Sequence, residues 1–114
     1  MKSRRFELFE RVVGGLPAKG ALRAIELEAR MIKDDLACRR EIHCEDAISI
    51  LNFCHFLHAA KSGGPFFQGV LSAEHMPFYD EIVKRLISAG ELPQAAKKQF
   101  DDVFLNDFMK RIAA

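Results

Sequence analysis

Hydrophobic residues recur at helical spacing along this chain, and glycine and proline separate the periodic stretches. The segments at 14–17 (GGLP), 62–65 (SGGP) and 89–93 (AGELP) each combine these two residues. Glycine suits the left-handed residue after a helix, and proline suits the first helical turn. No stretch alternates apolar and polar residues as a strand does. The pattern therefore predicts an all-α fold, a compact bundle of about five helices in a single helical domain spanning 1–114.

Two amphipathic helices are predicted before residue 41. The first is short, and its apolar stripe consists of Phe6, Phe9, Val12 and Val13. The second is predicted from about Pro17 to about Arg40. Its apolar residues follow the three-then-four spacing of a heptad seam: Leu22, Ile25, Ala29, Ile32 and Leu36. Such a seam favours packing against another helix.

The third predicted helix, over 45–61, is apolar nearly all round. Glu45 and Asp46 lie at its start, where acidic groups interact favourably with the helix dipole. A helix of this kind usually lies at the centre of a bundle or is shared with a second subunit. This helix and the heptad-like seam of the second helix together lead us to expect a homodimer.

Two more helices are predicted in the second half of the chain. After SGGP comes a short piece, PFFQGVL, for which one or two helical turns are predicted. A longer helix is predicted over 72–89, with Pro77 in its first turn. The last helix is predicted to begin near Pro93. Its apolar stripe consists of Phe100, Val103, Phe104, Phe108 and Ile112.

Composition and charge are those of an ordinary soluble domain, with 49% hydrophobic and 29% charged residues. The formal net charge is +1, although residues 1–40 carry ten basic and six acidic groups. The basic and amide residues at 94–99 precede Asp101 and Asp102 on the same helix, and these acids would repel phosphate. No stretch approaches the roughly 18 apolar residues of a membrane span. We therefore expect neither nucleic-acid binding nor membrane insertion.

The chain has three cysteines, Cys38, Cys44 and Cys54, and no Cys-x-x-Cys pair. An odd count without paired spacing does not form a disulfide framework and fits a reducing compartment. The N-terminal segment is charged and lacks the apolar run of a secretory signal. The sequence thus predicts a cytoplasmic location.

Three residues are candidate metal ligands. Cys54 and His58 are four residues apart and share a helical face, so they form half of a possible zinc site. The fold would have to bring His75 or Cys44 to them. Cysteine also behaves as a small apolar core residue, so we favour a buried Cys54 and hydrogen-bonded histidines, and we expect no cofactor.

Five residues are candidates for binding a small apolar ligand: His55, His58, Phe66, Phe67 and Tyr79. The two phenylalanines lie on the short connector after SGGP and could line a pocket together with the helix that follows. They could equally cover the core, and we favour this second interpretation.

Catalytic motifs are missing from the sequence. No Glu-x-x-His pair of a di-iron bundle occurs, and the Gly-Gly pairs lack the Lys-Ser or Lys-Thr of a phosphate loop. Our leading hypothesis is a non-enzymatic helical module for protein interaction or regulation that associates with itself. The alternative is a sensor or carrier that binds a metal or small apolar ligand near Cys54, His58 and the Phe66–Phe67 connector.

Overall fold

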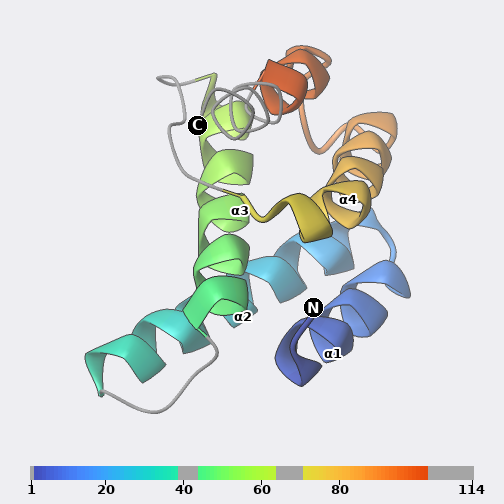
Figure 1. The fold of residues 1–114 in the computed structure, drawn as a ribbon. Helices are drawn as coiled ribbons and strands as arrows, with labels where there is room; N and C mark the ends of the chain where they lie inside the picture. The colour runs from blue at the N-terminus through green and yellow to red at the C-terminus, as the bar shows by residue number, and fades with distance from the viewer. Residues whose placement is uncertain (1, 39–43, 64–70, 103–114) are drawn as a thin grey trace.

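The computed structural model describes residues 2–38, 44–63 and 71–102 of the chain. It contains α1 (Arg4–Gly14), α2 (Ala18–Ala37), α3 (Cys44–Ser62), the 3₁₀ turn η1 (Ala73–His75) and α4 (Met76–Ser88) (Figure 1). Residues 95–102 are helical as well, and the described residues include no strand. The prediction of an all-α bundle of about five helices is confirmed. The stripe residues beyond Asp102 and the short piece after SGGP lie outside the described residues, apart from Leu71, which is not helical.

Local signals explain where these helices begin and end. The Ser3 side chain accepts a hydrogen bond of 3.2 Å from the Phe6 amide and so caps α1. Pro77 lies in the first turn of α4, where its missing N–H removes no helical hydrogen bond. Gly63 and Gly90 follow α3 and α4 with φ angles of 63° and 77°. This left-handed backbone strongly favours glycine, in agreement with the sequence pattern.

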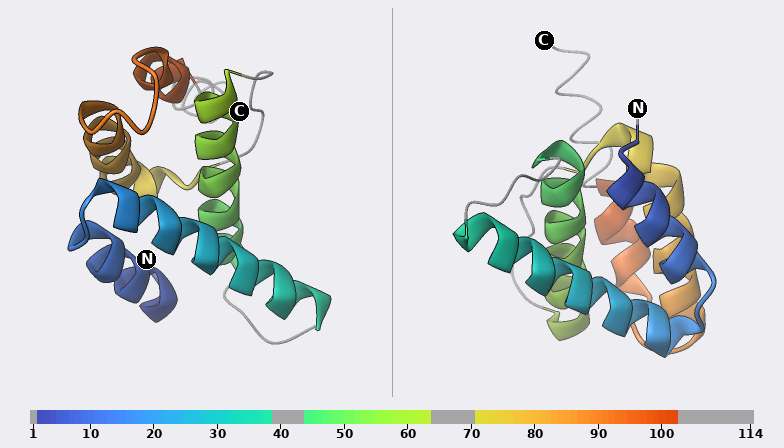
Figure 2. Two further views of the ribbon diagram at one scale, coloured as in Figure 1. Left: turned by 180° about the vertical axis from the view of Figure 1, so that it is seen from behind. Right: turned by 90° about the horizontal axis from the view of Figure 1, so that it is seen from below.

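Helix α2 is the element against which α1, α3 and α4 all pack. Figure 1 shows α3 standing across α2, whereas α1 and α2 run side by side in opposite directions (Figure 2). The helix at 95–102 packs on α3 through Phe100, whose ring centroid lies 5.6 Å from that of Phe56. Lys97 joins the same helix to α4 by an ion pair of 2.8 Å with Asp80. The described elements thus pack on α2 and α3.

Helix α3 is buried over most of its circumference, as its apolar composition predicts. Its buried apolar residues are Ala47, Ile50, Phe53, Cys54, Phe56, Leu57 and Ala60. They contact a core rich in aromatic rings, in which Tyr79 stacks on Phe53 with 4.0 Å between ring centroids. The exposed side of α3 carries Ile48, His55 and His58.

The heptad-like seam of α2 is also used inside the chain. Leu22, Ile25, Ala29 and Ile32 belong to the same buried core, and only Leu36 of that seam is exposed. Since the seam and most of α3 are covered by the chain's own helices, neither can serve as a dimer contact. The homodimer stays a prediction, and it requires a different surface.

No described helix combines the length and the apolarity needed to cross a membrane.

The core assignment can be checked with two identical substitutions on α3. Ile50 is fully buried and Ile48 is 40% exposed. Ile50→Ala should lower the free energy of unfolding by about 2–5 kcal/mol, because it leaves a cavity, whereas Ile48→Ala should change it by about 0.5 kcal/mol or less. Urea unfolding followed by circular dichroism measures both. Equal costs for the two variants would contradict the assignment.

Candidate functional site

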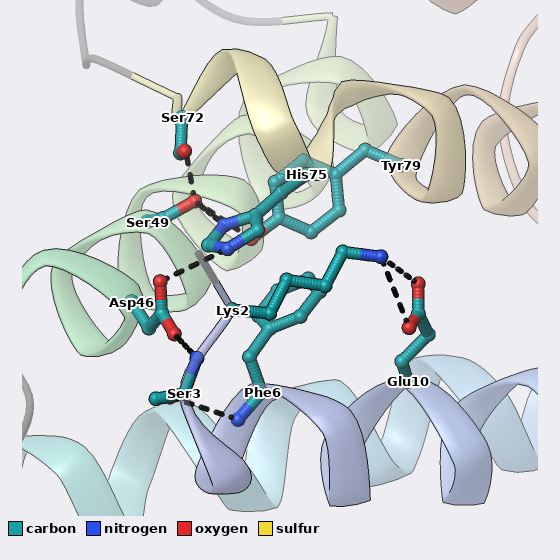
Figure 3. Close-up of polar contacts among 9 residues, drawn as sticks. All are labelled: Lys2, Ser3, Phe6, Glu10, Asp46, Ser49, Ser72, His75 and Tyr79. Atoms are coloured by element: carbon teal, nitrogen blue, oxygen red, sulfur yellow. Dashed lines mark hydrogen bonds and ion pairs between the residues drawn. The ribbon is translucent and has the colours of Figure 1, made fainter.

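Four polar side chains meet inside the core, and we call Asp46, Ser49, His75 and Tyr79 the polar network (Figure 3). Asp46 and Ser49 are three residues apart on α3, so they lie on the same face of that helix. His75 belongs to η1 and Tyr79 to α4. At most 3% of any of the four residues is accessible to solvent.

The Ser49 hydroxyl is the centre of the polar network. Its Oγ lies 2.8 Å from His75 Nδ1 and 2.8 Å from the Tyr79 hydroxyl, and it accepts a longer contact of 3.4 Å from the Ser72 amide. On the other side of the imidazole ring, His75 Nε2 lies 3.0 Å from Asp46 Oδ1. This last contact is close but poorly aligned for a hydrogen bond, so we regard it as mainly electrostatic.

Burial keeps His75 neutral. Desolvation lowers the pKa of His75 below its ordinary value of 6.5, although the nearby carboxylates of Asp46 and Glu74 act in the opposite direction. Burial also raises the pKa of Tyr79, so its hydroxyl keeps its proton. With the imidazole proton on Nε2 beside Asp46, Nδ1 accepts from Ser49, and the Ser49 oxygen accepts from Tyr79. The Ser49 hydroxyl then donates to His75 Nδ1, and the Tyr79 hydroxyl donates to Ser49 Oγ.

The start of α1 covers the polar network. The Ser3 amide donates a hydrogen bond of 2.6 Å to Asp46 Oδ2. The Phe6 ring stacks on the His75 ring with 3.6 Å between centroids and 7° between planes. Lys2 lies over the outer side of Phe6 and forms a 3.0 Å ion pair with Glu10. The polar network thus joins α1, α3, η1 and α4.

A carboxylate, an imidazole and a serine hydroxyl are the residue types of nucleophilic catalysis. Here the Ser49 hydroxyl is buried and already engaged by His75, Tyr79 and the Ser72 amide. In the described structure this hydroxyl joins helix α3 to η1 and α4. Sequence reasoning interpreted Asp46 as a helix-start acid and did not consider Ser49. The available signal was a pair of polar residues, three apart, on an otherwise apolar helix.

The three candidate metal ligands do not come together. Cys54 is buried, and desolvation, together with the charge of Glu26, raises the pKa of its thiol to about 11. His58 is exposed, and His75 belongs to the polar network. Among the described residues, no three His, Cys, Asp or Glu side chains gather in a way that could hold a metal ion. The buried thiol is unreactive at neutral pH.

The candidate ligand-binding residues that the structure describes differ in their surroundings. Tyr79 is fully buried in the core and His55 is exposed on α3, while Phe66 and Phe67 lie outside the described residues. The sensor or carrier hypothesis therefore stays a prediction. A pocket of about 350 Å³ does lie near Met76, Pro77 and Phe100, and its lining includes none of the five candidates.

An apolar surface groove of about 520 Å³ lies between α1 and α2. Leu8, Val12 and Met31 line this groove, and Leu27 lies one turn before Met31 on α2. We call these four residues the apolar strip; their exposed fractions are 48% for Leu8, 56% for Val12, 48% for Leu27 and 55% for Met31. Large apolar side chains that gather on one surface are typical of interaction sites. The sequence pattern had placed Val12 in the core stripe of the first helix, whereas the structure places it on the surface.

Arg5 fixes the position of α1 on α2 beside the apolar strip. Its guanidinium lies 2.9 Å from Glu28 Oε1 and 3.3 Å from Asp35 Oδ2. Because all three side chains are partly buried, these ion pairs are less screened than pairs in free solution. These ion pairs thus hold α1 against α2 beside the groove.

Comparisons of the chain with protein-family models, curated proteins and solved structures found no match.

Protonation of His75 should make the fold sensitive to acid. The pKa of His75 is lowered in the folded chain, so the unfolded chain binds this proton more readily. The stability that the neutral ring provides is complete above about pH 6.5 and is lost as the pH falls toward the lower folded pKa. Urea unfolding should give a smaller free energy of unfolding at about pH 5 than at about pH 7.5.

The matched variants are His75→Gln, which should flatten this pH dependence, and His58→Gln at an exposed site, which should preserve it. An unchanged slope in His75→Gln would assign the acid sensitivity to another group.

A double-mutant cycle measures the coupling within the polar network. Ser49→Ala leaves His75 Nδ1 and the Tyr79 hydroxyl without their shared partner and should cost about 1–3 kcal/mol. Tyr79→Phe should cost about 1 kcal/mol. The double variant should cost less than the sum by about 0.5 kcal/mol or more, because both changes remove the same hydrogen bond. Strict additivity would show that Ser49 and Tyr79 are independent, and the exposed Ser62→Ala on α3 is the control.

Proposed function

We propose that this chain is a non-enzymatic helical module for protein interaction or regulation, and that it associates with itself in the cytoplasm. The observation that carries the proposal is the apolar strip, which gathers four exposed large apolar side chains on two adjacent helices. Leaving these side chains in water has a free-energy cost of about 25 cal/mol for each Å² of apolar area. A partner that covers the strip removes this cost.

Two further features support a binding role over a catalytic one. The histidine and serine that resemble a catalytic set are buried and engaged with each other. The Cys54 thiol, whose pKa is raised by burial, is a weak nucleophile. The odd number of cysteines supports the reducing location that forms part of the proposal.

Sedimentation equilibrium of the full chain at micromolar concentration tests the proposal. We expect a mass above the 12.9 kDa of one chain, rising with concentration toward twice that value. Met31→Glu, on the apolar strip, should return the mass to that of one chain. Ile48→Glu adds the same charge at an exposed apolar residue of α3 and should leave association unchanged. A wild-type chain that stays at 12.9 kDa throughout would overturn self-association.

A further inference from the structure

We propose that the apolar strip is the contact surface of a two-fold symmetric dimer, in which α2 of one copy packs antiparallel against α2 of its partner. This inference rests on the proposed function and adds to it the surface, the orientation and the charge pairs. It is argued from the charges beside the strip and from the spacing of its residues.

The strip on α2 has a charge of opposite sign near each end. Arg23 lies four residues before Leu27, and Asp34 lies three residues after Met31. Both charged side chains are exposed, and neither forms an ion pair with another residue in the described part of the chain. Their separation of eleven positions corresponds to about three helical turns, so both lie on the same side of α2 as Leu27.

A two-fold axis makes this charge pattern complementary to itself. In an antiparallel pair of α2 helices, Arg23 of one copy meets the partner's Asp34, and symmetry repeats the contact at the other end. A parallel pair would instead place Arg23 against Arg23 and Asp34 against Asp34. Like charges that face each other are unfavourable, so the charges select the antiparallel arrangement.

The apolar residues fit the same register. The alignment that pairs Arg23 with the partner's Asp34 centres the contact between Glu28 and Ala29 of each α2. Leu27 then lies opposite the partner's Arg30 and beside its Met31. Ala24, which lines the groove with a small side chain, permits close approach of the two helices. Leu8 and Val12 of α1 flank this contact and can cover its edge.

The other charges near the strip do not distinguish the two orientations. Arg30, which is exposed between Leu27 and Met31, comes near the partner's Arg30 in both. Glu28, which lies near the centre, is already held by Arg5 of the same chain at 2.9 Å. Arg4 lines the groove on α1, and Arg11 is exposed on the same helix, with Glu7 between them. An acidic helix of another protein is the competing occupant of the strip. It would be attracted by the arginines and would gain nothing from Asp34.

Charge exchange at the two ends tests the proposal by sedimentation equilibrium on the full chain. Arg23→Asp and Asp34→Arg should each weaken self-association about tenfold, because each replaces two attractive contacts by two repulsive ones. The double variant Arg23→Asp/Asp34→Arg should restore the wild-type dissociation constant. Mixing the two single variants should give a heterodimer stronger than either homodimer, since each supplies the charge that the other needs. Lys61→Asp, an exposed charge reversal on α3, is the control.

Three other outcomes would overturn the proposal, and each contradicts a different part of it. A dimer that is unaffected by either single variant uses another surface, which overturns this inference and leaves self-association standing. Two single variants that both associate more weakly, without recovery in the double variant or the mixture, overturn the antiparallel register. A wild-type chain that remains monomeric overturns both this inference and self-association. Circular dichroism of each variant confirms that the helices are intact.

Discussion

The contact between the start of α1 and the polar network is the constraint on which the arrangement of the other surfaces depends. Asp46 accepts a hydrogen bond from the Ser3 amide, and the ring of Phe6 lies flat against that of His75. Buried polar groups are costly unless they are hydrogen-bonded, so the contact of Ser3 with Asp46 favours the start of α1 at this place. Loss of α1 would remove this hydrogen bond from Asp46 and the aromatic cover from His75.

This anchoring determines which side of α1 faces solvent. With Phe6, Phe9 and Val13 directed into the core, Leu8 and Val12 have to point outward. The ion pairs of Arg5 with Glu28 and Asp35 then hold α1 along α2, beside Leu27 and Met31. The apolar strip is therefore a consequence of the internal polar contacts, and it exists before any partner binds. A preformed surface loses little conformational entropy on association, which favours binding.

The helices could be predicted because their signals are local. Apolar spacing, the glycines at 63 and 90, and Pro77 define the helices without reference to the rest of the chain. The burial of Cys54 could also be predicted, since the helix that contains it is apolar on nearly all sides.

The heptad-like seam of α2 is an example of a feature that local signals do not decide. Spacing places Leu22, Ile25, Ala29 and Ile32 on one face, but it does not say whether the same chain or a second copy covers that face.

By itself, the sequence determined the helices, their approximate ends and the apolar character of α3. Only the tertiary structure decided that Val12 is exposed, that Cys54, His58 and His75 do not gather into a three-ligand metal cluster, and that Asp46 and Ser49 meet His75 and Tyr79. The physical reason is that helix formation depends on residues within a turn or two of each other. The meeting of η1 and α4 with α3 depends instead on how whole helices pack, to which every buried side chain contributes.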